Sequence, residues 1–184
     1  MKTDFSTGQM GPRPRRVKRV VYTREAIRAR VVEMAREISA AYGADEEVLM
    51  LGLLKGSFIF LADLVREVQL PLQVDFLLAS SYGDSMKSSG EVRLLYAPKA
   101  RLVGRSVIVV EDIIDSGTTL NRLMPLLEER RPRSLDVCAL LRKKGAEVDR
   151  APRWIGFEAP QEFLVGYGLD YGESFRHLPF IGSI

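Results

Sequence analysis

The hydrophobic residues of this chain follow two different spacings. Continuous apolar runs of strand length are typical of strands that are buried on both faces of a parallel sheet. Three runs are of this kind: residues 48–54, 107–110 and 134–141. Residues 72–79 alternate instead, which predicts a strand with Val74, Phe76 and Leu78 on one face. Because 107–110 consists of four β-branched residues, we expect it to be a central strand of the sheet.

Three other stretches have apolar residues at helical spacing. The first follows Thr23, a good N-cap residue, and Gly43 should end it. The second is broken by Leu70-Pro71, and Pro125 should kink the third or limit its regular part. The residues expected to face the core are Ile27, Val31, Met34, Ile38 and Tyr42, then Phe58, Leu61, Leu64, Val65 and Val68, then Leu120, Leu123, Met124 and Leu127.

The remaining segments are shorter or more polar. Short strands are expected at 91–96, 154–157 and 163–165, and residues 166–184 are rich in loops. Residues 80–91 are rich in Ser and Gly, and a polar loop of this length inside a compact domain is commonly a mobile lid. Strands that alternate with helices as far as residue 141 predict an α/β fold with a central, mostly parallel sheet flanked by helices.

Length and composition narrow the class of protein. A chain of 184 residues with 46% hydrophobic and 28% charged residues is expected to form one globular domain. No apolar run approaches the roughly 20 residues of a membrane span, so we expect no membrane partner. The single cysteine, Cys138, rules out an intramolecular disulfide framework and favours a cytoplasmic location. The single histidine, His177, argues against sites built on several histidines.

Basic residues are concentrated at the N-terminus. The net charge is +3, and the first 19 residues carry six Lys or Arg side chains against Asp4 alone. We expect residues 1–19 to form a basic, flexible arm and residues 20–184 to form the domain. Such an arm could contact nucleic acid, but a solvated arm is the more common case, so no nucleic-acid partner is expected.

The candidate binding and catalytic residues follow directly after the predicted strands. Lys55-Gly56 follows the run at 48–54, the segment from Glu111 to Thr119 follows 107–110, and Lys143 follows 134–141. Ligands of parallel α/β sheets gather at the carboxyl ends of the strands, so these residues should meet there. The backbone of Ser116-Gly117-Thr118-Thr119 at a helix start suits a phosphate group. A helix cap at Asp115 or Ser116 would explain one carboxylate, but this segment has three.

Three carboxylates next to a phosphate-binding turn would repel a bare phosphate, so their presence requires an explanation. Binding of magnesium, binding of ribose hydroxyls or proton transfer would each explain them. The string Glu111-Asp112-Ile113-Ile114-Asp115-Ser116-Gly117-Thr118-Thr119 resembles the phosphoribosyl-pyrophosphate (PRPP) binding signature of the type I phosphoribosyltransferases, and within them the hypoxanthine-guanine branch. The resemblance extends from about residue 48 to about residue 179. It implies a fold of that family with a small base-binding hood from residues 153–184.

The resemblance also implies roles for individual residues. Asp115 would be the catalytic acid or base at a purine ring nitrogen. The PRPP phosphate and ribose would be bound by Glu111, Asp112, Asp115, Ser116, Gly117, Thr118 and Thr119. Pyrophosphate would be bound by Lys55, Gly56, Ser81, Tyr82 and Arg176, with residues 81–90 as the lid. Mg²⁺ would be the cofactor, held near Glu111, Asp112 and Asp170. In that family the peptide bond before this lysine is commonly cis, and the sequence leaves open whether the Leu54–Lys55 bond is cis as well.

The purine would be bound by the hood and by the end of the strand at 134–141. Phe163 would stack on the base, Leu164 would supply backbone contacts to its edge, and Asp170 would lie near both the base and magnesium. Lys143 would contact the exocyclic oxygen of the base, with Lys144 as the alternative. The chain departs from some family members at Thr118, where they carry lysine, and a hydroxyl there can still bind phosphate.

Two functions remain open at this stage. The resemblance implies an enzyme of purine salvage that converts PRPP and a 6-oxopurine to a nucleoside monophosphate and pyrophosphate, and that forms homo-oligomers. The alternative is a regulator that senses PRPP or nucleotide and binds RNA or DNA through the basic arm. Lys143 and Asp170 belong to the base pocket and are both present, which favours the enzyme. The sequence does not rank hypoxanthine, guanine and xanthine as substrates.

Overall fold

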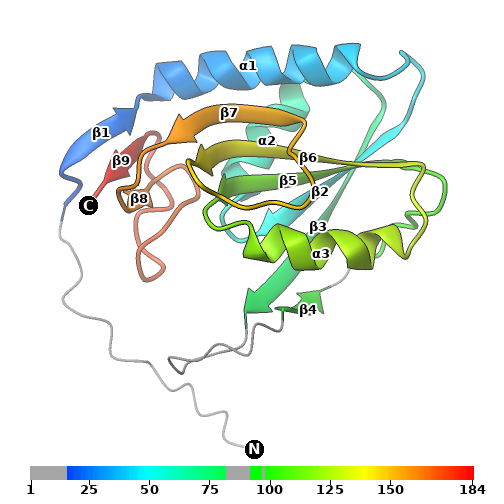
Figure 1. Ribbon diagram of the computed structural model, residues 1–184. Helices are drawn as coiled ribbons and strands as arrows, with labels where there is room; N and C mark the ends of the chain where they lie inside the picture. The colour runs from blue at the N-terminus through cyan, green and yellow to red at the C-terminus, as the bar shows by residue number, and fades with distance from the viewer. Residues whose placement is uncertain (1–15, 82–91, 97) are drawn as a thin grey trace, which may run out of the picture.

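The computed structural model describes residues 16–81, 92–96 and 98–184 and forms two sheets and three helices (Figure 1). The helices are α1 (Arg24–Ala40), α2 (Phe58–Glu67) and α3 (Thr118–Glu128). The strands are β1 (Arg19–Tyr22), β2 (Val48–Leu54), β3 (Leu72–Ser81), β4 (Val92–Tyr96), β5 (Ser106–Ile114), β6 (Ser134–Lys143), β7 (Trp154–Ala159), β8 (Leu164–Val165) and β9 (Ile181–Ser183).

The main sheet confirms the predicted fold class. Its strand order is β4-β3-β2-β5-β6-β7, and every neighbouring pair is parallel except β3 with β4. The apolar run of β2 and the first half of β5 are buried on both faces, which explains why these strands read as continuous hydrophobic stretches. The β-branched run 107–110 lies in the centre of the sheet, as expected.

Helices cover both faces of this sheet. In Figure 1, α1 and α2 lie on one side and α3 lies on the other. Ile27, Met34 and Leu64 from α1 and α2 belong to one buried apolar cluster, whereas Leu123 and Leu127 from α3 belong to a second. The sheet separates the two clusters, so the fold has two cores that share the sheet between them.

A small second sheet joins the two ends of the described chain. Its order is β1-β9-β8, with Arg19 opposite Ser183 and Leu164 opposite the same serine. β1 and β9 were not predicted from the sequence, because each is only three or four residues long and has no clear alternation of apolar and polar residues. The sheet lies beside the carboxyl ends of the main strands in Figure 1, at the place expected for a hood.

Three predictions of core residues or element ends need correction. Phe58 is 42% exposed, and Phe60 is fully buried instead, because Phe60 lies on the same face of α2 as Leu64, four residues later. The predicted Leu61, Leu64 and Val68 are buried. Val74 is 44% exposed, although it lies on a strand. Thr23 does cap α1 and accepts a hydrogen bond from the Ala26 N–H at 3.2 Å, but the C-cap of α1 is Ala41 rather than Gly43.

The predictions for α3 and β6 were also partly wrong. α3 continues through Pro125 to Glu128, although Pro125 has no N–H for the Asn121 carbonyl. Leu123 and Leu127 on either side of it are fully buried, and this packing keeps the backbone helical. β6 continues two residues beyond Leu141, so Arg142 and Lys143 belong to the strand rather than following it.

Some predictions concern residues that the structure does not describe. Residues 1–15 of the expected arm and residues 82–90 of the expected lid lie outside the described residues, and both expectations stay predictions. Ser81 is the last residue of β3. Among the helices of the described residues, none combines the length and the apolar character that a membrane span requires.

Candidate active site

The carboxyl ends of β2, β5 and β6 bring three predicted site segments to one edge of the sheet. These strands are neighbours in the order β2-β5-β6, and Ile114 at the end of β5 lies opposite Arg142 of β6. Asp115 follows Ile114 directly after β5, and Lys143 follows Arg142 as the last residue of β6. The Lys143 Nζ lies 3.0 Å from Asp115 Oδ1. The Lys143 side chain is 15% exposed and that of Asp115 is 67% exposed. An acid or base and a donor therefore lie together at the mouth of the site.

The turn after Asp115 has the geometry of an anion cradle. Gly117 adopts a left-handed conformation with φ of +88°, and α3 starts at the next residue. Ser116 Oγ lies 2.9 Å from Thr118 Oγ1 and accepts a hydrogen bond from the Thr118 N–H at 3.3 Å. The N–H groups of the first turn of α3 and the two hydroxyls supply the donors that a phosphate needs. Thr118, the departure from some family members, takes part in this cradle.

Glu111 and Asp112 lie near the end of β5, where both side chains are half-buried. Burial, followed by the charge of Asp112, raises the pKa of Glu111 well above its ordinary value. Burial also raises the pKa of Asp112 to about 6, although hydrogen bonds from the backbone and the charge of Arg176 oppose the rise. Glu111 Oε2 is buried without a hydrogen-bond partner among the described residues. A cation or a hydroxyl-bearing ligand would satisfy these carboxylates.

The loop after β2 lies directly against Asp112. A Cβ added to Gly56 would come within 1.7 Å of Asp112 Oδ2, so a glycine is required here. On the other side of the loop, a Cβ on Gly168 would come within 2.0 Å of the Gly56 carbonyl oxygen. The peptide bond between Leu54 and Lys55 is cis, in agreement with the family resemblance. Gly56 is therefore in close contact with the side chain of Asp112 and with the backbone of Gly168, two residues that are far from it in the sequence.

This close contact gives a first prediction. Gly56→Ala is expected to weaken pyrophosphate and PRPP binding by at least roughly tenfold, because relief of the clash must displace either Asp112 or the loop. Isothermal titration with pyrophosphate and Mg²⁺ measures the effect. Gly43→Ala is the matched control, because its Cβ would approach nothing closer than 3.9 Å. Equal affinities in the two variants would contradict the role given to the Gly56 loop.

Arg176 connects the hood to this loop. Its Nη2 lies 2.8 Å from Asp170 Oδ1 and 3.3 Å from Glu173 Oε1, and its Nη1 donates to the Gly168 carbonyl at 2.7 Å. The second oxygen of Asp170 accepts a hydrogen bond from the Glu173 N–H at 2.8 Å. Glu173 also pairs with Lys55 at 3.0 Å. The two cations predicted to bind pyrophosphate, Lys55 and Arg176, are thus joined by one carboxylate.

Glu173 was not predicted from the sequence to be a site residue. Its hydrogen bond with Lys55 lowers the pKa of its carboxyl group below the usual value, so it is an anion near neutral pH. The sequence does contain one indication of a role for Glu173: it lies between Asp170 and Arg176, which were both predicted to be site residues.

The side of the site that is predicted to bind the base is more exposed to solvent. Phe163 is 52% exposed, and its ring packs edge-on against Tyr171 with 5.4 Å between the ring centroids. Leu164 is buried in β8. Lys144 is exposed and its carbonyl accepts a hydrogen bond from Gln161, whereas Lys143 is directed toward Asp115. Lys143 rather than Lys144 is therefore adjacent to the other predicted residues. The side chain of Ser81 and all of Tyr82 are outside the described part.

The donor set suits Mg²⁺ only in combination with a substrate. Among the described residues, no three His, Cys, Asp or Glu side chains are grouped as a metal site. Mg²⁺ is commonly bound by one or two carboxylates, several waters and substrate phosphates rather than by a protein cage. The unpartnered Glu111 oxygen next to Asp112 fits this pattern. Asp170 has both oxygens engaged, by Arg176 and by the backbone of Glu173, so it is the less available of the three predicted ligands.

Comparison with known proteins agrees with this geometry. Residues 21–172 match the model of the phosphoribosyl transferase domain. The hypoxanthine phosphoribosyltransferase of Salmonella typhimurium is 46% identical over 160 residues, which are 86% of this chain and 90% of that protein. The hypoxanthine-guanine phosphoribosyltransferase of Mycobacterium avium is 46% identical over 179 residues, which are 93% and 87% of the two chains.

A solved structure is similar over nearly its full length. The hypoxanthine-guanine phosphoribosyltransferase of Bacillus anthracis superimposes with a TM-score of 0.87 at 40% sequence identity, covering 92% of this chain and 99% of that one. The family match spans the strands that lead to the Asp115 cradle and to Lys143. The chain therefore belongs to the phosphoribosyltransferase family, and its relatives place it in the hypoxanthine-guanine branch.

Proposed function

We propose that this protein is a purine-salvage enzyme that transfers the phosphoribosyl group of PRPP to hypoxanthine or guanine. The products are IMP or GMP and pyrophosphate. The observation that carries the proposal is the pair of Asp115 and Lys143, which lie 3.0 Å apart directly beside the Ser116–Thr119 cradle. A phosphate donor and a base with an exocyclic oxygen could each find their partners there. The family membership supports the same reaction.

The cradle and the neighbouring loops would hold PRPP in place. The N–H groups at the start of α3 and the hydroxyls of Ser116, Thr118 and Thr119 would bind the 5′-phosphate. Glu111 and Asp112 would accept hydrogen bonds from the ribose hydroxyls. Lys55, the Gly56 backbone and Arg176 would bind pyrophosphate, together with Ser81 and Tyr82 from the lid segment. Mg²⁺ bound near Glu111 and Asp112 would neutralise the negative charge that grows on the departing pyrophosphate.

In this reaction the bond from C1′ of the ribose to pyrophosphate breaks, and a bond from C1′ to a ring nitrogen of the purine forms. The proton of that nitrogen would pass to Asp115, whose exposed carboxylate lies at the mouth of the site. Lys143 would donate to the exocyclic oxygen, and the exposed face of Phe163 would stack on the base. Leu164 would contribute its backbone, and Asp170 would orient Arg176 through the contact at 2.8 Å.

The test is a product assay. The protein is incubated with PRPP, Mg²⁺ and, in separate reactions, hypoxanthine, guanine, xanthine or adenine, and the nucleotide and pyrophosphate are both quantified. We expect equal amounts of the two products with hypoxanthine or guanine, and none when PRPP is omitted. Formation of pyrophosphate without a nucleotide, or no product with either base, would overturn the proposal.

The regulator alternative is not supported. A sensor would need the phosphate cradle but not the base pocket, and here Lys143, Asp170 and Phe163 lie beside the cradle or the hood. The single buried cysteine remains compatible with a cytoplasmic enzyme. A homo-oligomeric state stays a prediction from the family resemblance.

A further inference from the structure

The loop between β6 and β7 begins one residue after Lys143 and turns back onto the cradle. The Ala146 N–H donates to the Lys143 carbonyl at 3.1 Å, which closes a tight turn behind the lysine. The Glu147 N–H then donates to the Ser116 carbonyl at 3.1 Å. Lys143 is the last residue of β6 and pairs with Ala159 of β7, so the loop can act on the lysine only at this end of the strand.

The structure leaves little space between this loop and the cradle. A Cβ on Gly117 would lie 2.0 Å from the Glu147 carbonyl oxygen, and φ at Gly117 is +88°. The left-handed glycine therefore serves two purposes: it shapes the phosphate cradle and admits the Glu147 carbonyl. Ala146 and Val148 of the loop pack against the apolar cluster that includes Leu120 of α3. The phosphate-binding and base-binding segments thus touch through their backbones.

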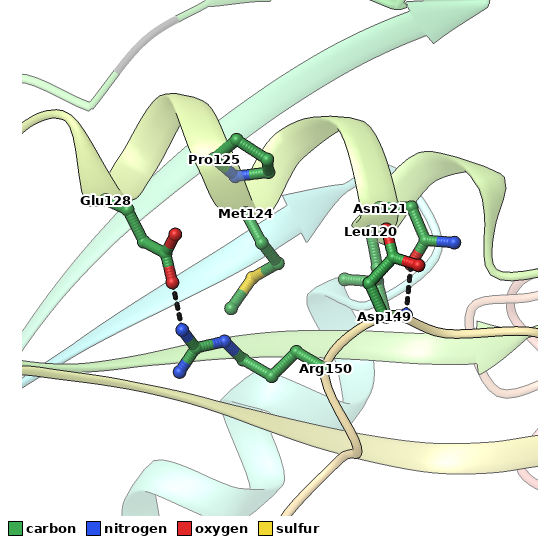
Figure 2. A pocket seen from close by; sticks show the side chains of 7 residues that line it. All are labelled: Leu120, Asn121, Met124, Pro125, Glu128, Asp149 and Arg150. Carbon is green, nitrogen blue, oxygen red and sulfur yellow. Dashed lines mark hydrogen bonds and ion pairs between the residues drawn. The ribbon is translucent and has the colours of Figure 1, made fainter.

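The side-chain amide of one residue forms hydrogen bonds to this loop through both its nitrogen and its oxygen. Asn121, on the first turn of α3, donates from Nδ2 to the Glu147 carbonyl at 2.9 Å. Its Oδ1 accepts from the Asp149 N–H at 2.8 Å, a bond that Figure 2 shows as a dashed line. The backbone N–H of Asn121 donates to the Gly117 carbonyl at 3.0 Å, so the side chain is anchored on the cradle itself. Asn121 is not among the predicted substrate contacts.

A second tie holds the same loop farther from Lys143. Arg150 pairs with Glu128 at the other end of α3, and both residues line the small hollow between α3 and the loop, as does Asn121 (Figure 2). Both side chains of this pair are more than 40% exposed, and exposed ion pairs contribute little to the stability of a fold. The Glu128–Arg150 pair therefore provides an internal comparison for Asn121.

We infer that Asn121 is a positioning residue for base recognition: it fixes the β6–β7 loop on the phosphate cradle and thereby holds Lys143 next to Asp115. This inference rests on the proposed function, because it assigns Asn121 an effect on the purine that Lys143 contacts. Asn121 acts only through the loop and does not touch the reacting atoms. Its removal should therefore loosen the position of Lys143 and leave the cradle, which has its own backbone bonds, in place.

The test is a double-mutant cycle measured as kcat/KM for hypoxanthine at saturating PRPP. Asn121→Ala in the otherwise unmutated enzyme should lower kcat/KM roughly tenfold, because two hydrogen bonds to the loop are lost. In the Lys143→Ala background, the same change should lower it by less than about twofold, since the loop no longer positions a lysine. The KM for PRPP should change by less than about threefold in both backgrounds.

The controls separate positioning from loss of structure. Glu128→Gln removes the charge from the Glu128–Arg150 pair, while Arg150 keeps its hydrogen bond to the Leu135 carbonyl, and the change should leave kcat/KM unchanged in both backgrounds. Asn121→Asp keeps the acceptor for the Asp149 N–H and loses the donor to Glu147, so it should give an intermediate value and serves as the second variant if Asn121→Ala does not fold. Equal losses with and without Lys143, or no loss in either, would overturn the inference. An unmutated protein that forms no nucleotide would instead overturn the proposed function.

Discussion

Asp115→Asn is expected to lower the rate of nucleotide formation by roughly 10²–10⁴, the usual contribution of a general acid or base. The amide retains the size of the carboxylate but cannot take the proton from the purine. PRPP binding should remain largely intact, because the cradle at Ser116–Thr119 donates from its backbone and hydroxyls. Single-turnover measurement of nucleotide formation, combined with titration of PRPP, separates the two effects.

The control for this experiment is Asp45→Asn. Asp45 is exposed in the turn between α1 and β2, at the opposite edge of the sheet from the site, and should tolerate the change with no effect on rate. A single-turnover rate for Asp115→Asn equal to that of this control would remove Asp115 from the chemistry. A loss that appeared only in PRPP affinity would assign it to the cradle alone.

Discrimination between hypoxanthine and adenine is expected to reach about 10⁴ in kcat/KM, because the site is built on polar matching. Lys143 presents only donors and its side chain is 15% exposed. Adenine has an amino group where hypoxanthine has an oxygen, so two donors would face each other. Lys143→Ala should lower kcat/KM for hypoxanthine by about 1–3 kcal/mol in transition-state free energy and have a much smaller effect on PRPP binding.

Lys144→Ala is the matched control for this prediction. Lys144 has the same charge and is adjacent in sequence, but it is exposed and has no ion pair among the described residues. We expect kcat/KM for hypoxanthine to be nearly unchanged in this variant. If the loss appeared in Lys144→Ala and not in Lys143→Ala, the base pocket would stand and the residue assigned to it would be wrong. Comparable kcat/KM values for adenine and hypoxanthine in the unmutated protein would refute the pocket itself.

The elements with strong local patterns could be predicted from the sequence. β2 matches its predicted bounds because its apolar run is uninterrupted and a glycine turn follows it. The cradle was predictable because a carboxylate, small hydroxyl residues and a glycine come together within a few positions after a buried strand. In each case, the information that determines the structure lies within about ten neighbouring residues.

The features that depend on distant contacts could not be predicted. β1 and β9 form strands only because the two ends of the chain meet, with Arg19 opposite Ser183, and neither segment has a pattern of its own. α3 tolerates Pro125 because Leu123 and Leu127 are held in the core. The role of Asn121 depends on a loop 26 residues away in sequence, and a single asparagine on a helix gives no local signal of such a partner.

The close contact of Gly56 with Asp112 and Gly168 has a consequence for how this enzyme could diversify. A Cβ on Gly56 would meet the Asp112 carboxylate, and a Cβ on Gly168 would meet the Gly56 backbone, so either substitution requires the neighbouring group to move. Single substitutions at these two glycines are therefore unfavourable on the side of the site that we propose binds pyrophosphate. Phe163 and Lys144, in contrast, are exposed at the rim of the base-binding side. New base preferences can therefore arise by stepwise substitution at the rim, whereas a change of phosphoribosyl donor would require several simultaneous changes.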